Sequence, residues 1–185
     1  MADLVTWALL LSSAVMIFFS AVMFLRLSEG VVQEKVVARK SLPFVTIAVP
    51  AWNEEDSLRE TVLSAMSIEY PKNKFEVIMI DDGSTDGTGS VAKQLLQEFR
   101  GRGFNLHLIV QENKGKAAAL NAALKKARGE FFACLDADSF ADRSAVKLQV
   151  DFFSRNDVDG RLAAVVPIML AYRPRKIVEL FQQFE

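Results

Sequence analysis

From Val45 onward, short apolar runs rich in β-branched residues alternate with longer segments whose apolar residues recur at helical spacing. Strands are predicted at 45–49, 75–80, 106–110, 131–135 and 162–170, and helices at 54–67, 91–99, 115–127 and 142–153. The segments between successive strands are long enough to cross over a sheet, which favours parallel pairing. The pattern therefore predicts an α/β fold in three layers, with a parallel sheet between helices.

The charge and the cysteine content narrow the class of protein. The net charge is −1 and the basic residues are spread along the chain, which argues against a nucleic-acid partner. The single cysteine, Cys134, cannot form an internal disulfide, which fits a reducing, cytoplasmic environment. Cys134 lies in an apolar run and is interpreted as a small core residue. The lone histidine, His107, has no metal-ligating cluster around it in the sequence.

An uncharged run from Leu4 to Leu25 precedes the alternating region. As a helix it would span about 33 Å, enough to cross the hydrocarbon core of a membrane. A secretory signal is the alternative, but Asp3 stands where a signal has a positive charge, and the apolar run is too long. The sequence therefore predicts a retained membrane helix.

The basic residues around this run predict its orientation. Arg26, Lys35, Arg39 and Lys40 all follow the run, and no Lys or Arg precedes it. The positive-inside rule then places the following domain in the cytoplasm. The predicted organisation is a transmembrane helix (1–26), a cytoplasmic connector (27–42) and a folded domain (43–185) at the cell membrane.

A polar cluster follows each of the first four predicted strands. The clusters are Pro50–Glu55, Asp81–Thr88, Gln111–Lys116 and Asp136–Asp138. In a parallel sheet the carboxyl ends of the strands meet at one edge, which is where open α/β folds bind their ligands. The sequence therefore predicts one site built from all four clusters.

Asp136 and Asp138 come directly after the fourth strand. Two residues apart on an extended backbone, their side chains would point the same way. Their hard oxygen atoms suit Mg²⁺ or Mn²⁺ that already carries phosphate oxygens. The same residues also suit a polar turn that caps the next helix. These residues alone leave both interpretations open.

Two residues in the other clusters suit a nucleotide. Trp52 lies among polar residues, where its ring could stack on a base, although a core position is the alternative. Lys116, in the first turn of a helix, adds a cation to the positive end of the helix dipole, which favours phosphate. A solvated lysine is the alternative.

Known glycine-containing loops do not explain these clusters. Asp82–Gly87 resembles half of a calcium loop, but Lys93 stands where that loop needs its bidentate Glu. The glycines of this segment suit turns. The sequence also contains neither a dinucleotide-binding glycine motif nor a phosphate-loop lysine motif.

Four segments together resemble family 2 glycosyltransferases with the GT-A fold. They are Val45–Glu54, Asp81–Thr88, Gly115–Asn121 and Asp136–Asp138, in matching order and spacing over roughly 43–185. With the preceding apolar helix, the chain is similar to membrane polysaccharide synthases of the poly-N-acetylglucosamine and hyaluronan type. The resemblance implies inverting, metal-dependent transfer from a nucleotide sugar, a UDP-sugar, to a glycan or lipid acceptor.

The resemblance also implies roles for individual residues. The nucleotide-sugar site would be formed by Pro50, Ala51, Trp52, Glu54, Asp82, Lys116, Asp136 and Ala137, with Asp138 and Asp136 at the Mg²⁺ or Mn²⁺ ion. Asp82 would meet the pyrimidine edge, Lys116 the donor, and Asp136 the ribose and diphosphate. Trp52 stands where the family usually has a stacking tyrosine.

The resemblance weakens after Asp138. The family's acceptor half supplies a catalytic base from a Glu-Asp pair, and the membrane synthases carry a Gln-x-x-Arg-Trp motif; neither occurs there. The last apolar stripe, 177–184, ends without a cap. We therefore expect the donor-binding part of a longer enzyme, with its catalytic base outside this span.

Two alternatives to the enzyme stay open. One is a catalytically incomplete, membrane-tethered module that binds a nucleotide sugar. The other is a sugar nucleotidyltransferase, which would need a loop rich in Gly and Arg after the first strand, where this chain has Pro50–Asn53.

Overall fold

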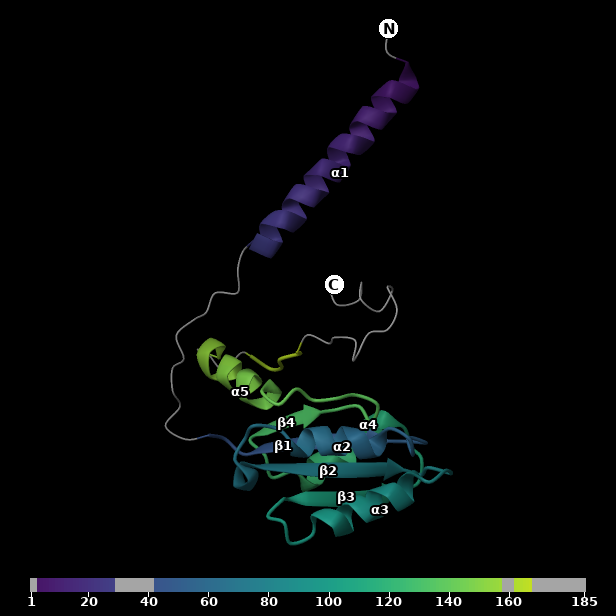
Figure 1. The fold of residues 1–185 in the computed structure, drawn as a ribbon, viewed down its shortest axis with the longest axis vertical. Coiled ribbons are helices and arrows are strands. Elements are labelled where there is room, and N and C mark those ends of the chain that lie inside the picture. The colour runs from purple at the N-terminus through teal and green to yellow at the C-terminus, as the bar shows by residue number, and fades with distance from the viewer. Residues whose placement is uncertain (1–2, 29–41, 158–161, 168–185) are drawn as a thin grey trace. The chain divides into compact units, whose positions relative to one another are not determined.

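The computed structural model describes residues 3–28, 42–157 and 162–167 (Figure 1). The chain divides into two units, Met1–Val36 and Val37–Glu185, and each is described by itself.

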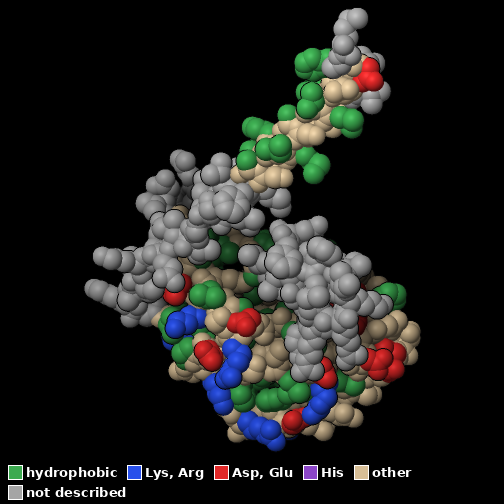
Figure 2. Space-filling model, turned by 45° about the horizontal axis from the view of Figure 1, so that its top comes forward, with side chains coloured by type: hydrophobic (Ala, Val, Ile, Leu, Met, Phe, Trp, Pro, Cys, Tyr) green, Lys and Arg blue, Asp and Glu red, His purple; other side chains and the backbone are tan. Residues whose placement is uncertain are grey.

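The first unit contains α1 (Leu4–Ser28), a helix of 25 residues. The Asp3 carboxylate accepts hydrogen bonds from the Thr6 backbone N–H (2.9 Å) and hydroxyl (2.7 Å), which caps the first turn. Apolar side chains lie along the described part of this helix (Figure 2), and Leu11 and Met16 are 69% and 73% exposed. Within the described ranges, no helix is long and apolar enough to cross a membrane, so the predicted membrane helix is not confirmed.

The second unit is built on a parallel sheet. Its strands are β1 (Val45–Ala51), β2 (Phe75–Asp82), β3 (Leu106–Gln111) and β4 (Phe131–Cys134), in the order β3-β2-β1-β4. The register pairs Val45 with Phe75 on one side and with Phe131 on the other. The predicted parallel α/β sheet is therefore confirmed.

Helices cover both faces of this sheet (Figure 1). They are α2 (Leu58–Met66), α3 (Thr88–Phe99), α4 (Lys116–Lys126) and α5 (Ala145–Asn156), with a short 3-10 turn, η1 (Lys72–Lys74). The larger core joins one face of the sheet to α2, α3 and α5, for example through Val62, Leu95 and Val150. On the other face, Ala119 and Ala123 of α4 pack against Ala48, Ile78 and Ile80. Alternate residues of each strand supply the two faces.

Expectations about the fourth and fifth predicted strands differ from the structure in two respects. Residues 162–167 of the fifth predicted strand form no strand, and residues 168–170 lie outside the described part. Cys134 is exposed and is not a core residue. It is the last residue of β4, which has a strand partner on one side only within the described sheet, so neighbours do not enclose its side chain.

Candidate functional site

The carboxyl ends of β1, β2 and β4 and the start of α4 surround a cavity of about 470 Å³. Every residue predicted from the sequence as part of the site lines this cavity. Its lining comprises Pro50, Ala51, Trp52, Glu54, Asp82, Asn113, Gly115, Lys116, Ala119, Asp136, Ala137 and Asp138. The convergence expected at the carboxyl edge of a parallel sheet is thus present, in a volume that suits a small-molecule ligand.

The loop after β1 places an aromatic ring at this cavity. Trp52 is 55% exposed, so it is not a core residue. The next residue, Asn53, adopts the left-handed conformation with φ of 57°. Its backbone N–H donates to the Ser84 hydroxyl (3.0 Å), and its Oδ1 accepts from the Thr85 N–H (2.9 Å). These bonds hold the loop beside the segment that follows β2.

The next two residues extend the same attachment. The Glu54 N–H donates to the Thr88 hydroxyl (2.8 Å), and Glu55 Oε2 accepts from the Gly87 N–H (2.6 Å). We call these two segments, residues 53–55 and 84–88, the loop clamp. A Cβ on Gly87 would lie 2.5 Å from Glu55 Oε2, so the close approach favours glycine there.

Asp86 belongs to the loop clamp and does not line the cavity. Its carboxylate accepts from the N–H (3.0 Å) and the hydroxyl (2.5 Å) of Thr88, at the start of α3. The hydroxyl bond and the backbone bonds hold the pKa of Asp86 below its ordinary value, against a weaker opposing effect of burial. The Ser84–Thr88 segment is therefore a structural turn in this structure.

Asp82 joins β2 to the loop before α4. Its side chain is 4% exposed, and its Oδ1 accepts from Gln111 Nε2 (2.7 Å) and from the Lys114 N–H (3.1 Å). Its Oδ2 accepts from the Gly115 N–H (2.8 Å). Asp82 thus lines the cavity while its carboxylate shapes the loop that leads to Lys116.

Lys116 and Asp136 form an ion pair at the cavity. The Lys116 ammonium lies 2.5 Å from Asp136 Oδ1, with the two side chains 58% and 50% exposed. The hydrogen bond to Asp136 and the negative charge there raise the pKa of Lys116, against a smaller effect of desolvation. The cation therefore stays charged at neutral pH.

The segment Asp136–Asp138 is a turn, which corrects the expectation of an extended backbone. β4 ends at Cys134, and the Ser139 N–H donates to the Asp136 carbonyl (3.0 Å). Ala137 is buried, and its carbonyl accepts from the Thr61 hydroxyl of α2 (2.7 Å). This anchor leaves Asp136 and Asp138 exposed at the cavity. The turn does not cap α5, whose N-cap residue is Ser144.

The oxygen donors for a cation are few. Among the residues that the structure describes, no group of three or more His, Cys, Asp or Glu could hold a metal ion. Asp136 and Asp138 supply two carboxylates, and Asp138 Oδ1 accepts from the Ser139 hydroxyl (3.2 Å). A small hard cation bound here would take its remaining ligands from a bound molecule or from water.

Sequence reasoning missed three lining residues and the loop clamp. Asn113 and Gly115 lie in the polar cluster 111–116 and could have been included on that ground, whereas Ala119 has no polar signal. The loop clamp depends on contacts between segments about 31 to 34 residues apart, which no local pattern predicts.

Comparison with known proteins finds glycosyltransferases, both through a family model and among individual relatives. The family model described as "Glycosyl transferase family 2" matches residues 46–182. Glycosyltransferase AglE of Haloferax volcanii is 32% identical over 120 residues, which cover 64% of this chain and 38% of that protein. Poly-beta-1,6-N-acetyl-D-glucosamine synthase of Staphylococcus aureus is 32% identical over 121 residues, 65% of this chain and 27% of the synthase. The chain thus matches less than half the length of these relatives.

Two solved structures are similar to this one. The mannosyltransferase PcManGT from Pyrobaculum calidifontis, in complex with GDP-Man and Mn²⁺, has a TM-score of 0.62 at 27% identity, covering 80% of this chain and 44% of its own. S. aureus TarS in complex with UDP-GlcNAc has a TM-score of 0.53 at 29% identity, covering 70% of this chain and 38% of its own.

Proposed function

The chain belongs to glycosyl transferase family 2, and from this premise we propose that its cavity binds a nucleotide-sugar donor. The protein then transfers the sugar to a glycan or lipid acceptor. One observation carries the proposal. A stacking ring, a lysine and two exposed carboxylates, contributed by different segments, line a single cavity at the carboxyl edge of the sheet. An aromatic ring suits the base, and a cation suits the diphosphate.

We propose a UDP-sugar as the donor. The exposed Trp52 ring offers a face for the base, and the buried Asp82 lines the same cavity. A UDP-GlcNAc complex of TarS and a GDP-Man complex of PcManGT, both similar in fold, support a nucleoside diphosphate sugar as the class.

Asp136 and Asp138 of the cavity lining fit Mg²⁺ or Mn²⁺; we call this part of the cavity the diphosphate end and the part at Trp52 the base end. Asp136 and Asp138 supply oxygen donors only, and such cations are commonly held by one or two carboxylates together with substrate phosphates. When bound, the cation would offset the negative charge that develops on the departing diphosphate. Lys116 adds a fixed positive charge at the start of α4, whose N-terminal N–H groups also favour phosphate.

The transfer that we propose inverts the anomeric centre. The acceptor oxygen forms a bond to the anomeric carbon while the bond from that carbon to the phosphate oxygen breaks. The hydroxyl proton passes to a general base. Three hydrogen bonds already engage the Asp82 carboxylate, and the Asp136 carboxylate is paired with Lys116. We place the base outside the described residues of the cavity.

The engaged carboxylates also favour a second candidate. A membrane-tethered module could bind the same donor without turnover. Transfer of radiolabelled sugar from UDP-sugars to a glycan or lipid by the chain would exclude it.

We also propose that residues 1–26 anchor the protein in the cell membrane, with the cavity on the cytoplasmic side. The uncharged run Leu4–Leu25 and the basic residues that follow it support this placement.

Calorimetric titration with UDP, with and without Mn²⁺, tests the donor site. We expect tight binding only with the cation, and Asp138→Ala should abolish this dependence. Asp86→Ala is the matched control for the cation dependence and should leave it unchanged, because that carboxylate bonds Thr88 within the loop clamp and does not line the cavity. Equal binding with and without Mn²⁺ in the parent protein would refute the metal-dependent donor site.

A further inference from the structure

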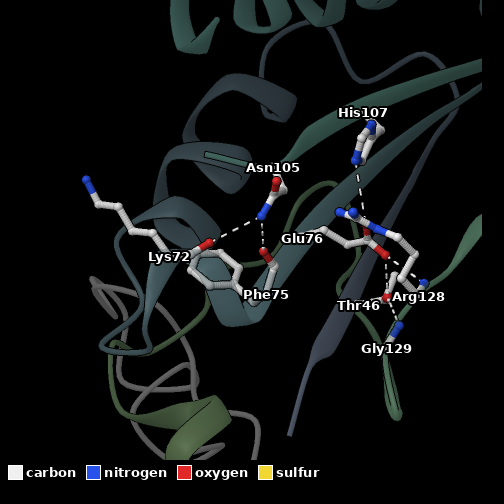
Figure 3. A network of polar contacts seen from close by, with 8 residues as sticks. All are labelled: Thr46, Lys72, Phe75, Glu76, Asn105, His107, Arg128 and Gly129. Atoms are coloured by element: carbon white, nitrogen blue, oxygen red, sulfur yellow. Dashed lines mark hydrogen bonds and ion pairs between the residues drawn. The ribbon is translucent and has the colours of Figure 1, made fainter. Parts of the chain in front are cut away.

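A buried carboxylate lies near the amino ends of the strands, away from the cavity. Glu76, the second residue of β2, is 1% exposed, and hydrogen bonds and an ion pair surround its carboxylate (Figure 3). Its Oε1 accepts from the Thr46 hydroxyl (2.7 Å) and from the Arg128 backbone N–H (2.8 Å). Its Oε2 accepts from the Arg128 guanidinium (2.8 Å) and lies 3.5 Å from His107 Nε2. Nothing in the proposed transfer uses this group.

The contacts of Glu76 attach the turn between α4 and β4 to the sheet. Arg128 bonds Glu76 through both its backbone and its side chain. The next residue, Gly129, donates its N–H to the Thr46 hydroxyl (2.9 Å), which itself donates to Glu76. A Cβ on Gly129 would lie 2.5 Å from both the Thr46 nitrogen and the Phe131 carbonyl oxygen, so the turn packs closely against β1 at this glycine.

This turn connects two segments that reach the cavity. α4 runs from Lys116 to Lys126, and β4 begins at Phe131 and ends two residues before Asp136. A helix and a strand are stiff, so a displacement of their shared turn moves the start of α4 and the end of β4. A slip of β4 by one residue against β1 would also turn its side chains to the opposite faces of the sheet.

We propose that Glu76 is a positioning residue for the diphosphate end of the donor site. By fixing the α4–β4 turn, it holds Lys116 at 2.5 Å from Asp136 and keeps Asp138 beside them at the cavity. Glu76 touches neither the donor nor the cation. This inference rests on the proposed function of the cavity.

The base end of the cavity provides an internal reference. The loop clamp holds Trp52, and none of its hydrogen bonds involves Glu76 or Arg128. A change at Glu76 should therefore weaken binding of the diphosphate and cation while binding of the nucleoside stays the same. A residue that only stabilises the fold would not separate these two quantities.

The test measures binding of uridine, and of UDP with Mn²⁺, to the full 185-residue chain in detergent. Trp7→Phe leaves Trp52 as the single tryptophan, so its fluorescence reports occupancy at the base end. We expect Glu76→Gln to leave the uridine Kd unchanged within error and to weaken binding of UDP with Mn²⁺ roughly tenfold to a hundredfold, as when a group that orients metal ligands is removed.

Two further variants complete the design. Arg59→Gln is the matched control, because it breaks an ion pair of similar length, Arg59–Glu98 (2.7 Å), away from the turn and the cavity. It should change neither Kd. If Glu76→Gln does not fold, as judged by circular dichroism, Arg128→Lys keeps a positive charge beside Glu76 but loses the forked contact. It should weaken binding of UDP with Mn²⁺ and leave the uridine Kd unchanged.

Three results would overturn the proposal. A lowered melting temperature with an unchanged ratio of the two Kd values would make Glu76 a stabilising residue only. Equal weakening of uridine and of UDP with Mn²⁺ would indicate general loosening of the sheet. A parent protein that binds neither compound would instead refute the proposed function, and this inference with it.

Discussion

Asn53 offers the sharpest test of how the fold presents Trp52 to the cavity. It combines a left-handed backbone, with φ of 57°, and a side-chain oxygen that accepts from Thr85. Three substitutions separate these contributions. Asn53→Asp keeps the acceptor and tolerates the conformation. Asn53→Gly keeps only the conformation, and Asn53→Ala keeps neither.

The expected magnitudes follow from these losses. The lost hydrogen bond costs about 1 kcal/mol, and a left-handed alanine costs about another 1 kcal/mol. If the loop clamp opens locally, nucleotide affinity falls with the population of the clamped loop. Asn53→Gly should then weaken UDP binding up to about fivefold and Asn53→Ala up to about thirtyfold, while Asn53→Asp stays close to the parent protein.

Fluorescence of Trp52 in the Trp7→Phe background, titrated with UDP and Mn²⁺, measures the series. Urea unfolding of the same variants shows whether the cost is local or global. The expected order of the variants, from strongest to weakest binding, is Asp, Gly, Ala. An alanine variant that binds as tightly as the glycine variant would show that the backbone conformation of Asn53 does not control the site.

Further predictions concern stability and topology. Leu95→Ala should lower the free energy of unfolding by about 2–5 kcal/mol, because Leu95 is fully buried between α3 and the sheet; a smaller loss in urea titrations would contradict the core described above. Gly129→Ala should destabilise by about 1–3 kcal/mol, since its Cβ meets backbone atoms at 2.5 Å, and a melting temperature equal to the parent's would disprove that crowding. Burial alone would raise the pKa of Glu76, but hydrogen bonds from Arg128 and Thr46 and the Arg128 charge hold it below its ordinary value of 4.5. The resulting stabilisation is present above pH 4.5 and is lost as the pH falls from there through the lowered pKa, so the melting temperature of Glu76→Gln should depend less on pH in that range. In a Cys134→Ser background, an impermeant thiol reagent should label a cysteine introduced at Asp3 on intact cells and spare one at Lys40, and the reverse pattern would contradict the proposed orientation.

Much of the fold and site was predictable because it depends on local pattern and on one rule of topology. Apolar periodicity predicted β1 to β4 and the four helices around them, with ends shifted by a few residues. Once the strands are parallel, their carboxyl ends must share an edge. For that reason, Trp52, Asp82, Lys116 and Asp136 could be assigned to one cavity without coordinates.

Expectations about backbone conformation and burial were less successful, since both depend on neighbours distant in sequence. Asp136 and Asp138 lie on a turn that the Thr61 hydroxyl anchors through the Ala137 carbonyl, a contact across 76 residues. Cys134 is exposed because β4 has one partner within the described sheet. Neither fact can be predicted from the residues nearby in the sequence.

The sequence by itself determined the kind of sheet and which loops meet at its edge, because strand periodicity and crossover length are properties of consecutive residues. Only the tertiary structure decided what holds those loops in place. From the sequence alone, Glu76 cannot be distinguished from any other charged residue near the start of a strand. Its role at the turn containing Arg128 and Gly129 arises because folding brings Thr46, 30 residues away, and Arg128, 52 residues away, to its two oxygens. A buried carboxylate is stable only with such partners, and those partners come from the packing of separate elements.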